Sequence, residues 1–287
     1  MGGLGNQLFQ IFTTIAVAKE IEADRNAENI TIFFKNTDCL SNRPTYWNNL
    51  LLSMKPVLKE PDEIPELPIS TSLSIFEKEH KYNPIEIPPS SENTLYTLNG
   101  YFQSPLYFQN RFKEIRDLTG ISDQLVRFRE SDRNLERKSQ TISLHFRIGD
   151  YALYPDYHPI MPISYYINAI NYILQETAST SEPQYVEYFF ETADIERVDN
   201  TVDILSLSFP SLTFIPNTDA IEDWQQMLSM SFCKHNIIAN STFSWWGAYL
   251  NENEGNIVCY PLKWFEWAIP ADVTTMFPKE WVCISAT

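Results

Sequence analysis

A histidine and an arginine stand two residues apart at the end of an apolar run, in the segment SLHFRIGDY at residues 143–151. If that run is a β-strand, His145 and Arg147 share a face, because alternate side chains of a strand point the same way. An arginine offers a rigid fork of donors and a permanent charge, and both suit the binding of a diphosphate. The alternative for this segment is an ion pair between Arg147 and Asp150 that closes a turn.

A second segment, NSTFSWWGAYL at residues 240–250, follows another apolar run and places hydroxyl side chains before an expected helix. Ser241 and Thr242 at such a strand-to-helix turn would cap the helix and leave backbone N–H groups for an anion. For these two residues we favour ligand contact over capping alone, because another strand end supplies Arg147. For Trp245 and Trp246 we favour core packing.

The chain opens on MGGLGNQLFQ, a glycine-rich turn that feeds an apolar helical pattern. As a dinucleotide fingerprint it is poor, because Gly3 and Gly5 would need a third glycine where Leu8 stands. The glycines more simply permit close backbone approach, with Asn6 or Gln7 reaching a ligand.

The elements that must position these residues alternate between apolar strands and amphipathic helices. In the second half we expect strands at 141–146, 185–190, 212–215, 235–239 and 256–261, and helices at 162–177, after Asp194, at 220–233 and at 241–251. In the first half we expect a helix at 7–21, strands at 29–34 and 94–102, a helix between Ser104 and Gly120, and a loop-rich stretch with seven prolines from Lys55 to Ser90. Such alternation predicts an α/β protein with parallel sheets covered on both faces. We place two Rossmann-like halves at 1–135 and 136–287, with ligands in a cleft at the C-terminal ends of strands.

The charge balance excludes some partners. The net charge is −16, from 37 acidic and 21 basic residues, which argues against nucleic-acid binding and against adsorption to an anionic membrane. None of the four cysteines, Cys39, Cys233, Cys259 and Cys283, is paired at CxxC spacing. We interpret them as free thiols that suit a reducing compartment. No run has the length of a membrane span and no signal-peptide pattern is present, so we expect a soluble, cytoplasmic protein.

Several motifs are absent from the sequence. It has no Walker A loop, no GxSxG and no DxD, the nearest approach to DxD being Asp194-Ile-Glu196. Its four histidines form no cluster with metal-ligand spacing. We therefore expect no metal and no cofactor, and a diphosphate would be neutralised by Arg147 and backbone N–H groups.

Taken together, GGLGNQLFQ, HFRIGDY and NSTFSWWGAYL resemble, in this order, the motifs of the α-1,2-fucosyltransferase family, glycosyltransferase family 11. The segments at 100–108, 189–198 and 222–239 also resemble that family's connecting segments, so the resemblance covers nearly the whole chain. It implies a GT-B fold, in which two Rossmann-like domains face a central cleft. It also implies inverting, metal-independent transfer of L-fucose from GDP-fucose to an acceptor sugar, usually to O2 of a galactose.

The resemblance also implies roles for single residues. Arg147 would hold the diphosphate, and His145 and Asp223 would recognise guanine. Ser241 and Thr242 would bind phosphate or guanine, and Asn6 would face the reacting sugar. The remaining positions expected on the donor side are Gly3, Gly5, Asp194, Asn240 and Ser244.

The sequence departs from the family pattern at three places. Ile148 replaces the second arginine of the motif; we expect it on the opposite strand face from Arg147 and buried, so that donor binding survives. FFETAD departs from the more usual FSDD of bacterial members and keeps only Asp194. Family members usually place a short apolar strand before the opening glycines, so this chain does without it, fills its place with another segment, or is truncated.

The catalytic base and the acceptor site stay open. Asp150, Asp156 and His158 follow the arginine strand and are candidates for the base, although Asp150 more simply orients Arg147, and related enzymes can dispense with a base. The acceptor surface is expected in the first half, from the 55–90 stretch and from Tyr46, Trp47, Tyr101 and Phe102. The alternatives to fucosyl transfer are another GDP-sugar transferase, a sugar- or nucleotide-binding protein without turnover, and a dinucleotide-dependent oxidoreductase.

Overall fold

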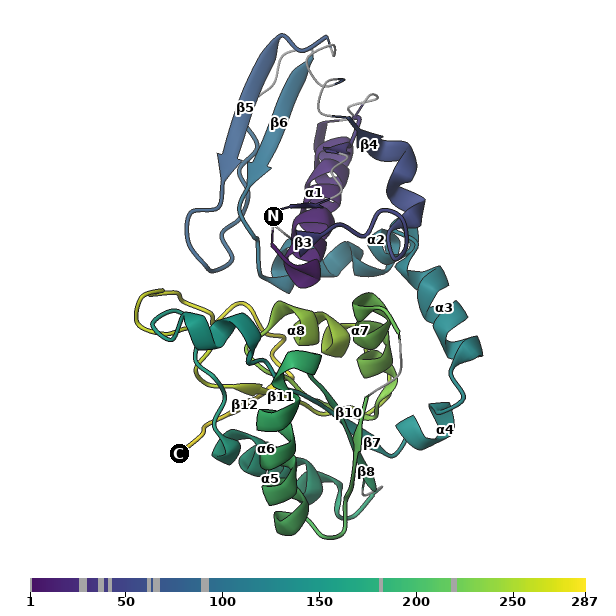
Figure 1. The fold of residues 1–287 in the computed structure, drawn as a ribbon. Coiled ribbons are helices and arrows are strands. Elements are labelled where there is room, and N and C mark those ends of the chain that lie inside the picture. Colours follow the sequence, from purple (N-terminus) through teal and green to yellow (C-terminus); the bar gives the residue numbers. More distant parts are fainter. Residues whose placement is uncertain are drawn as a thin grey trace. The chain divides into compact units, whose positions relative to one another are not determined.

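A computed structural model of the chain describes residues 2–25, 30–35, 39–40, 43–60, 63, 68–88, 93–180, 183–217 and 221–287. The chain divides into two compact units, whose elements are labelled in Figure 1. The first unit holds the residues up to Val126 together with Ala271–Pro278. The second holds Arg127–Pro270 and Lys279–Thr287.

The second unit is built on a six-stranded sheet in which all the hydrogen-bonded pairs of described strands are parallel. Its strands are β7 (Thr141–His145), β8 (Tyr185–Phe189), β9 (Thr213–Pro216), β10 (His235–Ile237), β11 (Val258–Pro261) and β12 (Val282–Ile284). They lie in the order β12-β11-β10-β7-β8-β9. The chain therefore winds outward from β7 to β9, returns to β10 beside β7, and winds outward the other way. This is the doubly wound Rossmann order, whose switch point lies between β7 and β10.

Each face of this sheet is covered by a different pair of helices. α5 (Ile163–Thr177) and α6 (Ile195–Ser208) lie side by side over one face and share an apolar core with Ile142 and Leu144 of β7. α7 (Asp223–Phe232) and α8 (Thr242–Tyr249) cover the other face. On this face Asn236 donates to Ser143 Oγ at 2.7 Å and to the carbonyl of Met230 at 2.9 Å. The face under α7 and α8 is thus the polar one.

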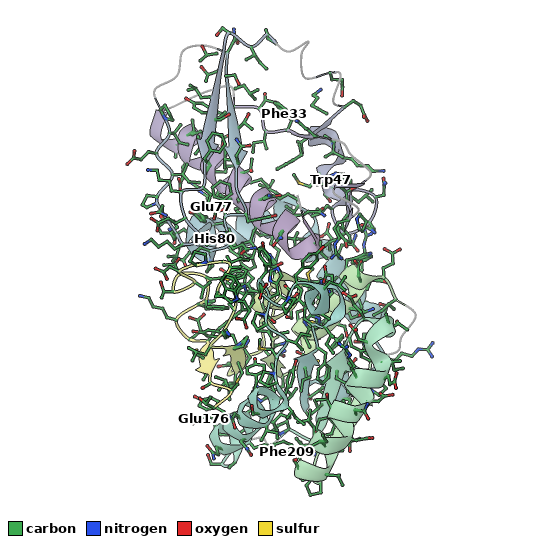
Figure 2. The ribbon with its side chains drawn as sticks, turned by 60° about the vertical axis from the view of Figure 1, so that its left-hand side comes forward. Phe33, Trp47, Glu77, His80, Glu176 and Phe209 are labelled. Carbon is green, nitrogen blue, oxygen red and sulfur yellow. The ribbon has the colours of Figure 1, made fainter. Side chains whose placement is uncertain are left out.

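α5 and α6 connect successive parallel strands, so the C-terminal ends of these strands are followed by loops. α5 and α6 run back against the parallel strands, so they end at the edge where the strands begin. Glu176, in the last turn of α5, and Phe209, just after α6, lie at the same end of this unit (Figure 2). The loops that follow β7, β8 and β10 occupy the opposite edge. α3 (Ile121–Ser131) and α4 (Leu135–Lys138) precede β7.

The first unit is built around a long helix, α1 (Leu4–Arg25), which packs Phe9 and Phe12 against Phe108. Short 3₁₀ turns, η1 (Leu52–Val57), η3 (Pro105–Tyr107) and η4 (Gln109–Arg111), precede α2 (Phe112–Leu118). Ser104 caps η3 by accepting from Leu106 N at 3.4 Å, so the predicted cap is present, but it begins a 3₁₀ turn and the α-helix expected from Ser104 to Gly120 is limited to Phe112–Leu118. The segment Ala271–Pro278 joins this unit through Thr275, which accepts from Tyr82 N at 2.7 Å and from the Ser104 hydroxyl.

The strands of the first unit, as far as the structure describes them, pair only two by two. The pairs are β1 (Phe34–Lys35) with β4 (Leu58–Lys59), β2 (Cys39–Leu40) with β3 (Arg43–Pro44), and β5 (Thr71–Phe76) with β6 (Thr94–Asn99). Of the strand expected at 29–34, only Phe34 is paired, residues 30–33 are not in a strand, and residue 29 lies outside the described residues. The described part of this unit therefore differs from the Rossmann-like half expected from its sequence.

The stretch at 55–90, expected to be rich in loops, also contains a strand that the sequence does not predict, β5. Residues 71–76 pair in parallel with β6 and alternate between half-buried and exposed side chains. The prolines of this stretch lie on either side of TSLSIF and leave its N–H groups free to pair.

The carboxylate of Glu77 fixes the corner that follows β6. Its two oxygens accept from the N–H groups of Tyr101 at 2.7 Å and Phe102 at 3.0 Å (Glu77 is labelled in Figure 2). Phe102 is turned into the core by this corner. Tyr46 and Trp47 are buried as well, so of the four aromatics expected to face an acceptor, only Tyr101 is exposed. The other three pack the interior of the first unit.

Candidate active site

Polar residues gather where three neighbouring strands of the second unit end. β8, β7 and β10 lie side by side in the sheet. His145 closes β7 and Arg147 follows it, Glu191 follows β8, and the turn at residues 240–244 follows β10. All of these residues therefore lie at the C-terminal edge of the sheet, at the switch point where doubly wound folds bind their ligands.

His145 and Ser244 join the two motifs of this edge. Nδ1 of His145 lies 2.9 Å from Ser244 Oγ, and its ring centroid lies 5.7 Å from that of Phe243. Ser244 Oγ is also 3.3 Å from the carbonyl of Ser241. When the hydroxyl proton goes to that carbonyl, Nδ1–H of His145 donates to Ser244 and leaves Nε2 as an acceptor.

The imidazole of His145 is neutral at physiological pH. Burial, with a smaller contribution from the charge of Arg147, lowers the pKa of His145 to about 3. The side chain can therefore recognise a ligand through hydrogen bonds but brings no positive charge to the site.

Arg147 is the positive charge of this edge, and two carboxylates hold it. Its guanidinium donates through one terminal nitrogen to Asp150 and through the other to Glu191. Its Cζ lies 4.7 Å from the ring centroid of Tyr151. The side chain of Arg147 is 13% exposed, whereas those of Asp150 and Glu191 are 40% and 51% exposed. The ion pair with Asp150 that the sequence offers as an alternative is present.

Glu191 is not among the site residues that the sequence predicts. It lies within FFETAD, where the sequence departs from the family pattern, and it reaches Arg147 from the end of a different strand. Only the order of strands in the sheet brings the two together, and a single sequence does not carry that order.

The segment after β8 also holds the loop that carries Arg147. Asp194 precedes α6 without capping it, and its Oδ2 accepts from Gly149 N at 2.8 Å. Gly149 has a φ of +31°, and a Cβ at this position would lie 2.7 Å from Glu191 Oε2. Ile148 is buried in the core formed with α5 and α6, as expected for the residue that replaces an arginine here.

The turn after β10 is held from several sides. Ser241 is the N-cap of α8, with Oγ accepting from Phe243 N at 3.4 Å, and Thr242 begins the helix. Asn240 is buried, its Nδ2 donates to the carbonyls of Pro159 at 3.0 Å and Trp264 at 3.1 Å, and its own carbonyl accepts from Tyr151 OH at 3.0 Å.

Trp245 and Trp246 are fully buried, as predicted for core residues. α8 packs closely on α7, because a Cβ on Gly247 would lie 2.9 Å from the Cβ of Met230.

Two of the three candidate bases lie around Tyr151. His158 stacks on Tyr151 with ring centroids 4.2 Å apart and 14° between the planes. Burial lowers the pKa of His158, and its Nδ1 has no hydrogen-bond partner among the described residues. Asp150 forms an ion pair with Arg147. Asp156 is exposed on the loop that joins Asp150 to His158. His158 is thus a neutral base candidate and Asp156 a solvent-exposed one.

Asp223 begins α7 and is exposed. Its Oδ1 accepts from Trp224 N at 2.7 Å, while the neighbouring Glu222 forms a capping box with Gln225. The guanine-binding role that the resemblance implies for Asp223 remains a prediction.

The opening glycines and Asn6 belong to the first unit. α1 begins at Leu4, so Gly5 and Asn6 lie in its first turn rather than in a loop, and Gly2 makes the turn with a φ of +87°. Asn6 Oδ1 accepts from Gln103 Nε2 at 2.8 Å. Gln7 is buried, and its Nε2 donates to the carbonyls of Gly2 at 3.0 Å and Pro44 at 2.8 Å, so it fastens the start of the chain.

Glycosyl transferase family 11 matches residues 77–285 of this chain. The chain belongs to this family. It is 30% identical to the O-antigen biosynthesis glycosyltransferase WbnK of Escherichia coli, over 92% of this chain and 93% of that protein. It is 26% identical to an alpha-1,2-colitosyltransferase of Escherichia coli, over 92% of this chain and 90% of that protein. A solved glycosyl transferase family 9 structure from Veillonella parvula is 12% identical and covers 96% of this chain and 69% of that one, with a TM-score of 0.40, which is too weak a likeness to bear on the fold.

As a family 11 glycosyltransferase, the protein needs a place for a nucleotide-sugar donor. The C-terminal edge of the second unit's sheet offers one guanidinium, a hydroxyl-lined turn at a helix N-terminus, and a neutral imidazole. Within the described ranges, no group of three or more His, Cys, Asp or Glu side chains is placed to hold a metal ion. No helix in those same ranges is both long and apolar enough to cross a membrane. Cys233, Cys259 and Cys283 are free thiols, and the side chain of Cys39 lies outside the described residues.

Proposed function

We propose that this family 11 glycosyltransferase transfers L-fucose from GDP-fucose to a hydroxyl of a glycan acceptor, O2 of a galactose or a similar residue, with inversion and without a metal. The observation that carries the proposal is the meeting of Arg147 and the 240–244 turn at the switch point of a Rossmann-type sheet, joined by the 2.9 Å contact of His145 with Ser244. Family membership supports the reaction class.

In this proposal the second unit holds the donor. Arg147 binds the diphosphate, and the N–H groups at the start of α8, beside Ser241 and Thr242, add the partial positive charge of a helix N-terminus. His145, neutral and anchored by Ser244, recognises guanine through hydrogen bonds, together with Asp223. Asn240, Gly3, Gly5 and Asp194 shape the surroundings of the donor, Asp194 by its bond to Gly149 N.

The chemical step is an in-line displacement. The acceptor hydroxyl attacks the anomeric carbon, the bond from that carbon to the phosphate oxygen breaks, and GDP leaves with the bonding electrons. The transition state resembles an oxocarbenium ion, as in glycoside hydrolysis. Negative charge grows on the β-phosphate, so the charge of Arg147 stabilises the transition state more than the bound donor, and no metal is needed.

The proton of the acceptor hydroxyl leaves to a base or to solvent. His158 is a suitable base because its lowered pKa keeps the imidazole neutral, and Asp156 is the alternative on the same loop. Asn6 faces the reacting sugar in this proposal. We further infer a GT-B arrangement, with the acceptor side within 1–135 and the donor side within 136–287. We place the reaction in the cytoplasm because free thiols suit a reducing compartment.

A second candidate donor follows from the colitosyl name of the second relative. Colitose is a deoxyhexose like fucose that lacks the hydroxyl on carbon 3, so the same diphosphate and guanine contacts would serve its GDP derivative. This alternative changes the sugar pocket and leaves the roles of Arg147 and His145 as they stand.

The experiment is a donor and acceptor screen with and without EDTA, together with a calorimetric titration of GDP. GDP-fucose, GDP-colitose, GDP-mannose and UDP-galactose are each incubated with a panel of galactose-terminated oligosaccharides, and nucleotide release and product linkage are read by chromatography and NMR. We expect GDP release from GDP-fucose and an α-1,2-linked product. Preference for GDP-colitose would establish the second candidate. GDP binding without turnover of any donor would indicate a binding protein, and activity that EDTA abolishes would contradict metal independence.

A further inference from the structure

Glu191 occupies one terminal nitrogen of Arg147, a donor that an anionic ligand could otherwise use. Its carboxylate receives a hydrogen bond from one terminal nitrogen of the guanidinium, while Asp150 holds the other. The side chain of Arg147 is itself only 13% exposed, so the two carboxylates and the ring of Tyr151 take up most of its surroundings. A phosphate oxygen that binds the terminal nitrogens of this guanidinium therefore competes with the two carboxylates.

The two carboxylates are not equivalent. Asp150 lies three residues after Arg147 in the same short loop, whereas Glu191 reaches over from the end of β8. Glu191 is also the more exposed, at 51% against 40%. An exposed carboxylate regains its hydration when it leaves an ion pair, so it is the cheaper of the two to displace.

The loop keeps space for Glu191 in this position. Gly149 has a φ of +31°, and a Cβ there would lie 2.7 Å from Glu191 Oε2 and 3.1 Å from its Cδ. Gly149 N is held by Asp194 Oδ2 at 2.8 Å, and Asp194 lies on the same segment as Glu191. The segment after β8 thus supplies one carboxylate that fixes the loop and another that covers its arginine.

We propose that Glu191 is a positioning residue that competes with the donor diphosphate for Arg147. Without a donor, it holds the guanidinium in place and screens it from other anions. When the donor binds, a phosphate oxygen takes the place of the Glu191 carboxylate and Asp150 keeps the arginine oriented. Glu191 lowers the affinity for nucleotide diphosphates and speeds the release of the GDP product. This inference rests on the proposed function, because it takes the diphosphate to bind at Arg147.

The test measures GDP binding by calorimetry, and donor kinetics, in Glu191→Gln. Removing the carboxylate's charge while keeping its shape is expected to tighten GDP binding by about two- to fivefold, the range for ion pairs at partly exposed sites. KM for the donor falls by a similar factor, while kcat stays level or falls because product release slows. Glu196→Gln, an exposed glutamate five residues further on, removes the same charge from the same segment and is expected to leave the affinity unchanged.

The possible outcomes separate the inference from the proposed function. If Glu191→Gln binds GDP as wild type does or more weakly, or if Glu196→Gln tightens binding as much, the competition is overturned while the donor site at Arg147 stands. If neither the wild type nor any variant binds GDP, the proposed function fails and the inference falls with it. Glu191→Ala is also expected to bind GDP more tightly than wild type. It shows whether the effect comes from the lost carboxylate rather than from the new glutamine side chain, and its melting temperature checks that it folds.

Discussion

His145 and Ser244 lie 99 residues apart in the sequence and 2.9 Å apart in the structure, Nδ1 to Oγ. The contact joins the end of β7 to the first turn of α8, across the point where the strand order of the sheet reverses. It fixes the orientation of a buried, neutral imidazole at the edge of the sheet. If this imidazole recognises the donor's base, the hydroxyl of Ser244 determines which way its hydrogen-bonding groups face.

Ser244→Ala is expected to raise KM for the GDP-sugar about five- to twentyfold with a smaller change in kcat. The reason is that it leaves a buried nitrogen without its partner, at the cost of about one buried hydrogen bond. The control is Ser231→Ala, which removes another buried hydroxyl, one that donates only to the carbonyl of Leu228 at 2.7 Å. Steady-state kinetics with varied donor check the prediction, and equal effects of the two substitutions would contradict it.

Tyr151 offers a pair of substitutions that separate two roles. Tyr151→Phe removes the hydrogen bond to the carbonyl of Asn240 but keeps the ring beside Arg147. We expect it to lower the free energy of unfolding by about 1 kcal/mol and to change kcat/KM little. Tyr151→Leu also removes the ring, which contacts Arg147 and stacks on His158, and is expected to lower kcat/KM further, by up to about tenfold; the cation–π contact alone contributes about 0.5–2 kcal/mol. Activity that depends on the hydroxyl rather than on the ring would show that this division of roles is wrong.

Acidification is expected to destabilise the protein through two histidines. Burial lowers the pKa of His145 to about 3 and that of His235 to about 4, from an ordinary value of 6.5. Below pH 6.5 the unfolded chain takes up protons that the folded chain does not, so stability falls as the pH falls. Between pH 6.5 and pH 5.0 each histidine accounts for a loss of about 1.5 kcal/mol.

The measurement is urea unfolding at these two pH values, compared between wild type, His145→Asn and His235→Asn. Each substitution removes one titrating group, while the carboxylates, which also titrate in acid, stay the same. A wild-type loss between the two pH values that neither substitution reduces would rule out the histidines as its source.

The close contact of α7 and α8 predicts that Gly247→Ala is destabilising. The new Cβ would lie 2.9 Å from the Cβ of Met230, and overpacking of this kind costs about 1–3 kcal/mol, more than the gain of up to about 1 kcal/mol from replacing a helical glycine. Gly3→Ala is the matched control, because a Cβ there has no neighbour within 4 Å. Melting temperatures test the pair. A Gly247→Ala protein with the melting temperature of the wild type would show that α8 can move away from α7.

The sequence predicts the second unit well because its signals are local. Continuous apolar strands and amphipathic helices define β7 to β11 and α5 to α8 within a few residues. Alternation along a strand also places His145 and Arg147 on the face away from Ile148. β12 is not predicted, since its three residues become a strand only by pairing with β11.

The first unit and the surroundings of Arg147 are harder to read from one sequence. β5 lies inside a proline-rich stretch, and its pairing with β6 outweighs that composition. Trp47 and Phe102 have the side chains of a sugar-binding surface, but packing buries them. Glu191 reaches Arg147 because β8 adjoins β7, and strand order is a property of the whole sheet.

The most direct test of the central claim is a calorimetric titration of GDP, in the presence of EDTA, into the wild type and Arg147→Ala, with Arg111→Ala as the control. Arg111 also pairs with a glutamate, Glu114, but belongs to the first unit, whereas Arg147 belongs to the second. We expect the wild type and Arg111→Ala to bind GDP equally. Arg147→Ala is expected to bind at least about tenfold more weakly and to lose about 100-fold in kcat/KM, as for the loss of one charge-stabilising donor. Undiminished GDP binding by a folded Arg147→Ala protein would contradict the assignment of the donor diphosphate to this edge of the sheet.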